Sequence, residues 1–337
     1  MRLRRVSVDS PGLTRRRAGK GFVYLDATGR RIDDPEVLER CKSLVIPPAW
    51  REVWICPVPN GHIQAVGTDD AGRRQYLYHP AWRERRDRAK HEHVLAMAGA
   101  LPAARERAAV DLTRPGMPRE KALAVAFTLL DRGFFRVGSE AYTEQNGSFG
   151  LATIRKEHVR IRRDGTIEFD YIAKSGQRRQ LVLEADADLR APIATLRRRR
   201  GGGEELLAYR RSRQWFDITS GDINAHVKEL LGPDSSAKDF RTWHGTVLAA
   251  LALGRAEHAS SARKRAKVVR AAVVEVSENL GNTPTVCRAS YIDPQVIERY
   301  ERGETVPREL AERAAQPVPM SDTERAAVER EVLALLA

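Results

Sequence analysis

The spacing of apolar residues in this sequence changes near residues 85–90, and this change limits the folds that the chain can adopt. Before this point, short segments alternate apolar and polar residues between turn-forming sequences such as Pro-Asn-Gly and Asp-Asp-Ala-Gly, which is typical of antiparallel strands. After it, alanine-rich segments carry apolar residues at helical spacing. The pattern predicts an α+β chain with a β-rich N-terminal domain at residues 1–88 and a larger, mainly helical domain at residues 89–337.

One stretch inside the helical part returns to a strand pattern. Residues 157–185 alternate with period two, and Arg-Asp-Gly-Thr and Lys-Ser-Gly-Gln stand where two hairpin turns would fall. They predict a three-stranded meander within the larger domain. The low-complexity run Thr195–Glu205, "TLRRRRGGGEE", predicts an exposed helix end and a flexible loop. The chain ends in an amphipathic pattern in which Ser321 and Glu324 form a capping box.

The charge of the chain points to its partner. It has 58 Lys and Arg against 45 Asp and Glu, a formal net charge of +13. A strongly basic chain favours a polyanionic partner, most often nucleic acid. Only ten of the basic residues are lysines, and a GC-rich genome would also produce such an arginine bias.

The composition also indicates a compartment. The sequence contains no apolar run of about 18 residues that could span a membrane, and no signal peptide pattern. Its three cysteines, Cys41, Cys56 and Cys287, are odd in number and far apart. This spacing argues against a disulfide framework and a thiolate metal cluster, so we expect a reducing cytoplasm and no membrane partner.

Several enzyme signatures are missing. The glycine run "GGGEEL" lacks the Lys-Ser/Thr of a phosphate loop, and no His-x-x-x-His, Cys-x-x-Cys or carboxylate cluster is found. We therefore expect no nucleotide, no metal and no small-molecule cofactor. Phosphoryl chemistry without a metal needs another source of positive charge, and arginine provides forked donors for it.

Two arginines follow core-forming aromatic residues. Arg136 comes directly after Phe134-Phe135, at the end of a helix predicted over residues 118–133, so the aromatic pair would hold its guanidinium rigidly. The alternative is an arginine that extends from a helix end into water. Arg241 lies at the edge of a predicted buried helical stripe of Phe240, Trp243, Val247 and Leu251. Its alternative is a structural ion pair with Asp239 or a nearby glutamate.

Lysines and a basic helix add to these candidates. Lys174 falls at the second predicted hairpin turn and could act as a general acid, because a lysine can give up a proton that an arginine keeps. A solvated turn lysine is the alternative. Basic residues also crowd the start of a helix, where the macrodipole disfavours them and phosphate contacts would explain them. They are Arg263, Lys264, Arg265, Lys267 and Arg270.

Taken in order, these pieces resemble a known family. "FFRVG", the hairpin lysine, "KDFRTWHGT" and an asparagine nine residues before the tyrosine of "SYI" are similar to the type IB DNA topoisomerases, in particular the compact poxvirus-like enzymes of bacteria. The resemblance implies that Tyr291 attacks a DNA phosphorus to form a 3′-phosphotyrosyl link. It implies that Arg136 and Arg241 bind the non-bridging oxygens and that Lys174 protonates the 5′-oxygen. Asn282 stands where many members carry histidine.

The resemblance also extends to the N-terminal domain. "IPPAW…GHIQAVGTDDAGRRQYLYH" is similar to the β-rich clamp of this family, which implies a monomer that closes around duplex DNA in the bacterial nucleoid. Gln75, Tyr76 and Tyr78 match the clamp strand that faces the duplex, and Tyr142 matches a tyrosine near the scissile phosphate. For each aromatic residue the alternative is packing within the fold. Most clamp contacts would go to phosphates and would not read the DNA sequence.

Two departures define the rival interpretations. Asn282 can donate a hydrogen bond but cannot carry a proton, so proton donation would depend on Lys174. A tyrosine recombinase shares this catalytic layout but usually has histidine three residues before the second arginine, where this chain has Lys238. A DNA-binding protein without activity is the other rival. The complete set of five residues and the β-rich N-terminal domain favour the topoisomerase.

Overall fold

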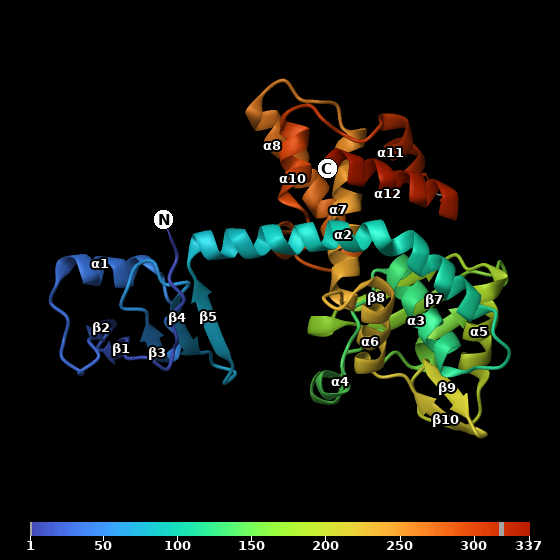
Figure 1. Cartoon of the computed structure of the whole chain (residues 1–337), viewed down its shortest axis with the longest axis horizontal. Helices are drawn as coiled ribbons and strands as arrows, with labels where there is room; N and C mark the ends of the chain where they lie inside the picture. The colour runs from blue at the N-terminus through green and yellow to red at the C-terminus, as the bar shows by residue number, and fades with distance from the viewer. Residues whose placement is uncertain (1, 317–319) are drawn as a thin grey trace. The chain divides into compact units, whose positions relative to one another are not determined.

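The computed structural model describes residues 2–316 and 320–337 (Figure 1). The chain divides into two compact units, residues 1–90 and residues 91–337. The long helix α2 (Pro80–Leu112) begins in the first unit and continues into the second. Among the described residues, no helix has the length and apolar character needed to cross a membrane. The same residues contain no group of three or more His, Cys, Asp and Glu side chains placed to hold a metal ion.

The first unit is built on one antiparallel sheet. Its five strands lie in the order β2-β1-β3-β4-β5, so β5 forms an edge. One helix, α1 (Pro35–Ser43), begins where the Asp34 side chain accepts hydrogen bonds from the backbone of Glu36 and Val37. The core between helix and sheet includes Cys41 and Ile55. The strands are β1 (Leu13–Ala18), β2 (Gly21–Leu25), β3 (Arg51–Ile55), β4 (Ile63–Thr68) and β5 (Arg74–Tyr78).

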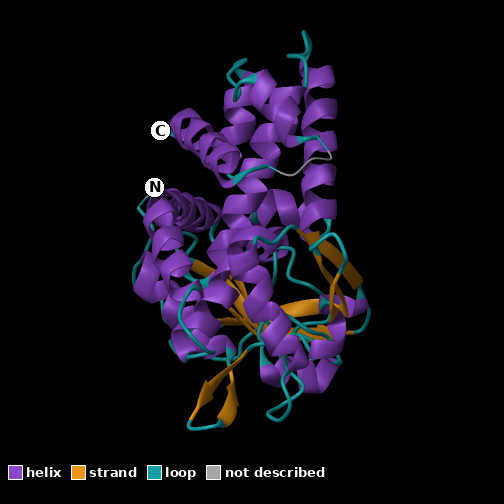
Figure 2. Ribbon diagram, turned by 90° about the vertical axis from the view of Figure 1, so that its right-hand side faces the viewer, coloured by secondary structure: helices purple, strands orange, loops and turns teal. Residues whose placement is uncertain are grey.

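The second unit is mostly helical and confirms the predicted meander. Strands β6 (Val159–Ile161), β7 (Ile167–Ile172) and β8 (Arg178–Leu183) form a three-stranded antiparallel sheet. A second hairpin, β9 (Ala208–Arg211) and β10 (Gln214–Asp217), is an element that the sequence did not predict. It stands out from the lower edge of this unit, and helices account for most of the remainder (Figure 2).

The helices that follow α2 contribute to one core, except α4, which has no buried residue. They are α3 (Arg119–Gly133), α4 (Glu140–Asn146), α5 (Ala187–Arg198), α6 (Ser220–Leu231), α7 (Ala237–Arg255), α8 (Ala262–Leu280), α9 (Pro284–Ser290), α10 (Pro294–Glu301), α11 (Arg308–Ala314) and α12 (Asp322–Leu336). The predicted capping box of Ser321 and Glu324 begins α12. Helices α3 and α7 are buried along nearly their whole length, and Phe127 meets Phe240 edge to face between them. These two helices form the rigid base of the site.

One sequence expectation about a loop was met only in part, because α5 ends at Arg198 and most of residues 195–205 are exposed but not all of them. The predicted exposed run at residues 195–205 contains Arg199, whose side chain is buried and donates to the backbone oxygens of Leu196 and Leu206 at 3.2 and 3.0 Å. This arginine satisfies carbonyls that the glycine turn would otherwise leave without donors. Residues 284–290, just before Tyr291, form helix α9, which begins with Thr283 as its N-cap and Pro284 in its first turn.

A buried charge network joins four helices of the second unit. Asp131 at the end of α3 pairs with Arg105 of α2 at 2.8 Å and with Arg325 of α12 at 2.9 Å. His244 of α7 is buried beside it and donates from Nε2 to the Asp131 carbonyl at 2.9 Å. Burial lowers the pKa of His244 to about 4, although Asp131 acts in the opposite direction. The histidine is therefore neutral in the folded protein at neutral pH.

This histidine predicts a loss of stability in mild acid. Its pKa is lower in the folded state than the ordinary value of 6.5, so the unfolded chain takes up a proton first as the pH falls. The contribution of the neutral His244 to the free energy of unfolding is fully present above pH 6.5, and about 3 kcal/mol of it is lost as the pH falls towards 4. Urea unfolding followed by circular dichroism at pH 7, 5.5 and 4.5 measures this slope. His244→Gln, which keeps a donor for the carbonyl, should flatten it, and an unchanged slope in the variant would refute the assignment.

Candidate active site

Arg136 is held by the way α3 ends. Phe134, the residue after α3, adopts a left-handed conformation with φ 54°, which turns the chain back so that Phe135 enters the core against Phe169. The backbone oxygen of Arg136 then accepts a hydrogen bond from Leu151 at 2.8 Å. Two glycines make this approach possible: a Cβ atom on Gly150 would lie 2.5 Å from the Gly138 backbone. Core packing therefore determines the position of Arg136, as the sequence predicted.

Arg241 lies in the second turn of α7 and is more buried than the sequence suggested. Only 3% of its surface is exposed, although the pattern placed it at the edge of the buried stripe. Its guanidinium donates to the backbone oxygens of Phe134 and, at 2.7 Å, of Leu280. Asp239 instead accepts hydrogen bonds from Ser236 at the start of α7, so the alternative of an Asp239–Arg241 ion pair was wrong.

Asn282 joins the two arginines. Its Oδ1 atom accepts a hydrogen bond from Arg241 Nη2 at 2.5 Å and another from Arg136 Nη2 at 3.0 Å. The oxygen must face the arginines, because guanidinium groups only donate. Arg136 also donates to the Gly281 carbonyl at 2.8 Å. The acceptors at residues 280 and 281 end helix α8, whose negative dipole end offsets part of the repulsion between the two cations.

The charge of the two arginines is not balanced by carboxylates. Within the described part of the chain, neither Arg136 nor Arg241 has a carboxylate oxygen within 4.0 Å. Burial and, to a smaller extent, the nearby Arg136 together lower the pKa of Arg241 to about 10. The buried Arg241 Nε has no acceptor among the described residues. Such a pair of cations is suited to an anion with several oxygens, such as a phosphate.

Tyr291 lies against Arg241. It caps the C-terminus of α9, where its backbone N–H donates to the Cys287 carbonyl at 2.9 Å. Its half-buried ring has its centroid 5.1 Å from the guanidinium carbon of Arg241. Gly245 on α7 allows this position, since a Cβ atom there would lie 2.5 Å from the Tyr291 carbonyl oxygen. The tyrosine is therefore packed directly on the helix that carries Arg241.

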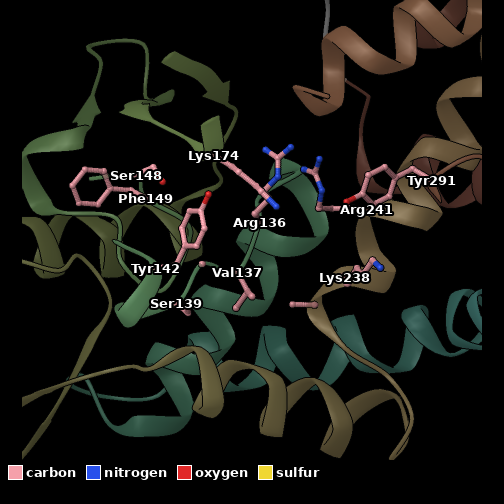
Figure 3. A pocket seen from close by; sticks show the side chains of 12 residues that line it. Arg136, Val137, Ser139, Tyr142, Ser148, Phe149, Lys174, Lys238, Arg241 and Tyr291 are labelled. Atoms are coloured by element: carbon pink, nitrogen blue, oxygen red, sulfur yellow. The ribbon is translucent and has the colours of Figure 1, made fainter. Parts of the chain in front are cut away.

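Lys174 enters from the opposite side. It lies between β7 and β8, exposed, with its amine 6.0 Å from the ring of Tyr142, which stands on α4. Arg136, Arg241, Lys174 and Tyr291 line one pocket of 270 Å³, which we call the arginine pocket. Figure 3 shows the two guanidinium groups side by side, with Tyr291 beyond Arg241 and Lys174 beside Arg136. Four of the five predicted catalytic residues thus share one cavity, and Asn282 lines the adjoining one.

Lys238 is a residue of the arginine pocket that the sequence analysis did not propose for it. It lies in the first turn of α7, exposed, three residues before Arg241. Side chains three apart lie on the same face of a helix. That spacing was the signal that could have identified it.

The predicted DNA-contact residues fall in separate places. On β5 of the first unit, Tyr76 and Tyr78 share one face, where their rings stack with centroids 6.0 Å apart and each is 39% exposed. Gln75 lies on the other face, and its amide donates to Asp69 at 2.9 Å. In the second unit, the predicted basic residues occupy the start of α8, which Ser261 caps. Arg263, Lys264 and Lys267 are exposed, and Arg265 donates to the Ala259 carbonyl.

Comparison with known proteins places this geometry in a family. Residues 79–315 match the family described as the catalytic core of eukaryotic DNA topoisomerase I, and residues 21–69 match the N-terminal domain of bacterial DNA topoisomerase IB. The chain is 27% identical to DNA topoisomerase 1B of Acanthamoeba polyphaga mimivirus over 298 residues, which is 86% of this chain and 88% of the viral protein.

Plant proteins match over a shorter region. DNA topoisomerase 1 of Daucus carota is 29% identical over 130 residues, 38% of this chain and 15% of the carrot protein. DNA topoisomerase 1 alpha of Arabidopsis thaliana is 24% identical over 127 residues, 38% of this chain and 13% of its own length. The core match alone covers more than half of the sequence. The chain belongs to the type IB DNA topoisomerase family.

Proposed function

We propose that this enzyme relaxes supercoiled duplex DNA by cutting one strand through Tyr291, letting the DNA rotate and rejoining the strand. The observation that carries the proposal is the pair of guanidinium groups of Arg136 and Arg241, which share Asn282, have no carboxylate partner among the described residues and lie beside a tyrosine. A phosphodiester would supply the missing negative charge at the position that a tyrosine nucleophile can reach.

The chemistry is a balanced exchange of esters. The Tyr291 oxygen forms a bond to phosphorus, its proton passes to water, and the bond from phosphorus to the 5′-oxygen breaks. The ammonium of Lys174 gives a proton to the departing 5′-oxygen, which leaves a 3′-phosphotyrosyl enzyme. Rejoining reverses each step. Since the tyrosyl ester keeps the energy of the broken phosphodiester, the proposed cycle requires no ATP.

The arginines stabilise the transition state. Three of the five N–H groups of Arg241 donate to protein oxygens, and its Nε is one of those that remain for a phosphate oxygen. The hydrogen bonds of Arg136 to Gly281 and Asn282 both come from Nη2, so its Nη1 can also face the phosphate. These donors are already oriented and partly buried. Their hydrogen bonds therefore strengthen more than those of donors in water as negative charge builds on the phosphate oxygens. They supply the charge that a metal ion supplies in other phosphoryl transfers.

DNA binding would involve both units. We propose that residues 1–88 form a clamp whose exposed Tyr76 and Tyr78 face the duplex, while the start of α8 and Tyr142 contact phosphates near the cut. We propose that Gln75 supports this surface through Asp69 rather than lying on it. We propose that the protein acts as a monomer that closes around DNA in the bacterial nucleoid.

A plasmid assay tests the function. Purified protein is mixed with supercoiled plasmid in EDTA without ATP, and a Tyr291→Phe preparation made in the same way controls for contaminating enzymes. We expect ladders of partly and fully relaxed circles from the wild type. Failure to relax the plasmid under any salt condition that permits binding would overturn the proposal. Recombined plasmid products in place of relaxed topoisomers would favour the recombinase.

Asn282 offers a sharp test of the charge argument. Asn282→Asp keeps the shape of the side chain but places a carboxylate between Arg136 and Arg241, where it would pair with both. We expect cleavage to slow by about 10² or more, since the arginines lose the unbalanced charge that attracts phosphate. Single-turnover cleavage of a duplex oligonucleotide whose short cleaved strand diffuses away measures the rate. Asn282→His is the control that should retain activity, and equal rates for Asp and Asn would contradict the argument.

A further inference from the structure

Two histidines of α2 lie beside the segments that carry the nucleophile and the second arginine. His91 Nδ1 is 3.7 Å from an oxygen of Asp293, two residues after Tyr291. His93 Nε2 is 3.7 Å from an oxygen of Asp239, two residues before Arg241. One helix therefore contacts both halves of the proposed cleavage site.

Asp293 connects three elements. It is 2% exposed, and its backbone N–H donates to Thr246 of α7 at 3.1 Å. Its Oδ1 atom accepts from the backbone of Gln295 at 2.9 Å and so begins α10. With His91 at its other oxygen, Asp293 attaches the chain just after Tyr291 to α7, α10 and α2.

Asp239 has the same kind of position on the other half. Its Oδ2 atom accepts from the backbone N–H and the hydroxyl of Ser236, each at 2.8 Å, and closes the first turn of α7. His93 lies against this same oxygen. A shift of α2 at this point would move the first turn of α7. That turn carries Lys238, which lines the arginine pocket, and Arg241 lies in the next turn.

We propose that His91 and His93 are positioning residues for cleavage, which hold the Tyr291 segment and the first turn of α7 in register from a single helix. The inference rests on the function proposed above. Hydrophobic packing would stabilise the position of α2 at least as well as these two histidine–carboxylate contacts, of which that of His91 is buried and that of His93 is partly exposed. What these contacts add is a fixed point of electrostatic attraction: each histidine places one ring nitrogen 3.7 Å from one carboxylate oxygen, beyond hydrogen-bond distance. The helix that provides them starts at Pro80 and covalently links the two units.

The expected effect lies in the chemical step and not in DNA binding. A displacement of about 1 Å between nucleophile and arginine is enough to slow a reaction about 10²-fold. His91→Ala and His93→Ala should each slow single-turnover cleavage of prebound DNA about 10- to 100-fold, with DNA affinity changed less than about threefold. His91→Asn and His93→Gln place an amide nitrogen near the original Nδ1 and Nε2 and should restore most of the rate.

A matched control separates positioning from folding. His226 of α6 is also buried and lies 3.6 Å from a carboxylate oxygen, that of Glu229 on the same helix. His226→Ala should leave the cleavage rate of prebound DNA unchanged. Should His91→Ala fail to fold, Asp293→Asn carries the test, because asparagine still caps α10 but loses the charged oxygen facing His91.

The outcomes are distinct. Slow cleavage by the alanine variants, rescue by the amide variants and normal cleavage by His226→Ala support the inference. Wild-type rates for His91→Ala and His93→Ala would overturn it, as would equal losses for alanine and amide variants, or an Asp293→Asn protein that cleaves normally. If the wild type itself does not cleave, or Tyr291→Phe still does, the proposed function fails instead.

Discussion

Replacing Arg241 by alanine is expected to slow DNA cleavage by at least about 10² to 10³, the usual cost of removing one oriented donor to a transition-state oxyanion. The change also leaves the carbonyl oxygens of Phe134 and Leu280 and the amide oxygen of Asn282 without this donor. Arg241→Lys should recover only part of the rate, because a lysine carries the charge but lacks the fork that bonds the protein and the phosphate together. Single-turnover cleavage with saturating enzyme measures the effect.

The control for Arg241 is Arg179. Its guanidinium also donates to carbonyls near the end of α8, those of Glu278 and Asn279, but it lines the adjoining pocket and not the arginine pocket. Arg179→Ala disturbs the same helix end without removing a donor that faces Tyr291. We expect its effect on cleavage to be much smaller. An equal loss in both variants would mean that Arg241 acts by holding α8, and full activity of Arg241→Lys would contradict the forked-donor role.

The second large effect is expected for Tyr291→Phe. The substitution removes one oxygen and keeps the ring that packs on Arg241 and Gly245, so folding and DNA affinity should stay close to those of the wild type. Relaxation should fall below detection and no covalent adduct should form, because no other nucleophile replaces the hydroxyl. Gel electrophoresis of plasmid and of denatured protein–DNA mixtures checks both results.

Tyr142→Phe is the matched control for the nucleophile. Tyr142 lines the same pocket, is 39% exposed and lies near Lys174, so its hydroxyl is the obvious competitor. This variant should still form the covalent adduct, with at most a modest loss of rate. If Tyr142→Phe abolished the adduct while Tyr291→Phe retained it, the two assignments would have to be exchanged.

The strands that the sequence revealed were those with conventional signals. The meander was predicted because Gly165 and Gly176 lie in its turns. Hairpin β9–β10 was missed because Ser212 and Arg213 occupy its turn with φ 49° and 71°, where glycine or asparagine would be expected. In these cases the turn residues, and not the strands, decided whether the pattern could be seen.

Strand β1 was missed for a different reason. Its sequence is dominated by consecutive arginines, so it shows no apolar alternation. Arg15 stacks over Phe22 at 4.1 Å and donates to the backbone oxygens of Ile46 and Pro47, each at 2.8 Å. Arg15 therefore packs on an aromatic ring as an apolar residue would, and its hydrogen bonds join this strand to the loop before β3.

The sequence predicted which residues form the site but not the hydrogen bonds that connect them. The order of motifs along the chain identified Arg136, Arg241 and Tyr291, which the fold brings to one pocket. It did not reveal that Asn282 accepts from both arginines, or that carbonyls at the end of α8 hold them. The carbonyl acceptors are backbone atoms distant in sequence, and the identity of a residue does not reveal which hydrogen bonds its carbonyl oxygen accepts.

The covalent joining of Tyr291 to the 3′ end of a cut DNA strand can be measured directly. A duplex oligonucleotide whose 5′ product strand diffuses away traps the adduct, and mass spectrometry of the protease-digested complex locates the modified residue. We expect a nucleotide attached through its 3′-phosphate to Tyr291, in the peptide of residues 289–299 that cleavage after arginine produces. Attachment at another residue, attachment through a 5′-phosphate, or cleavage without any covalent adduct would contradict this expectation.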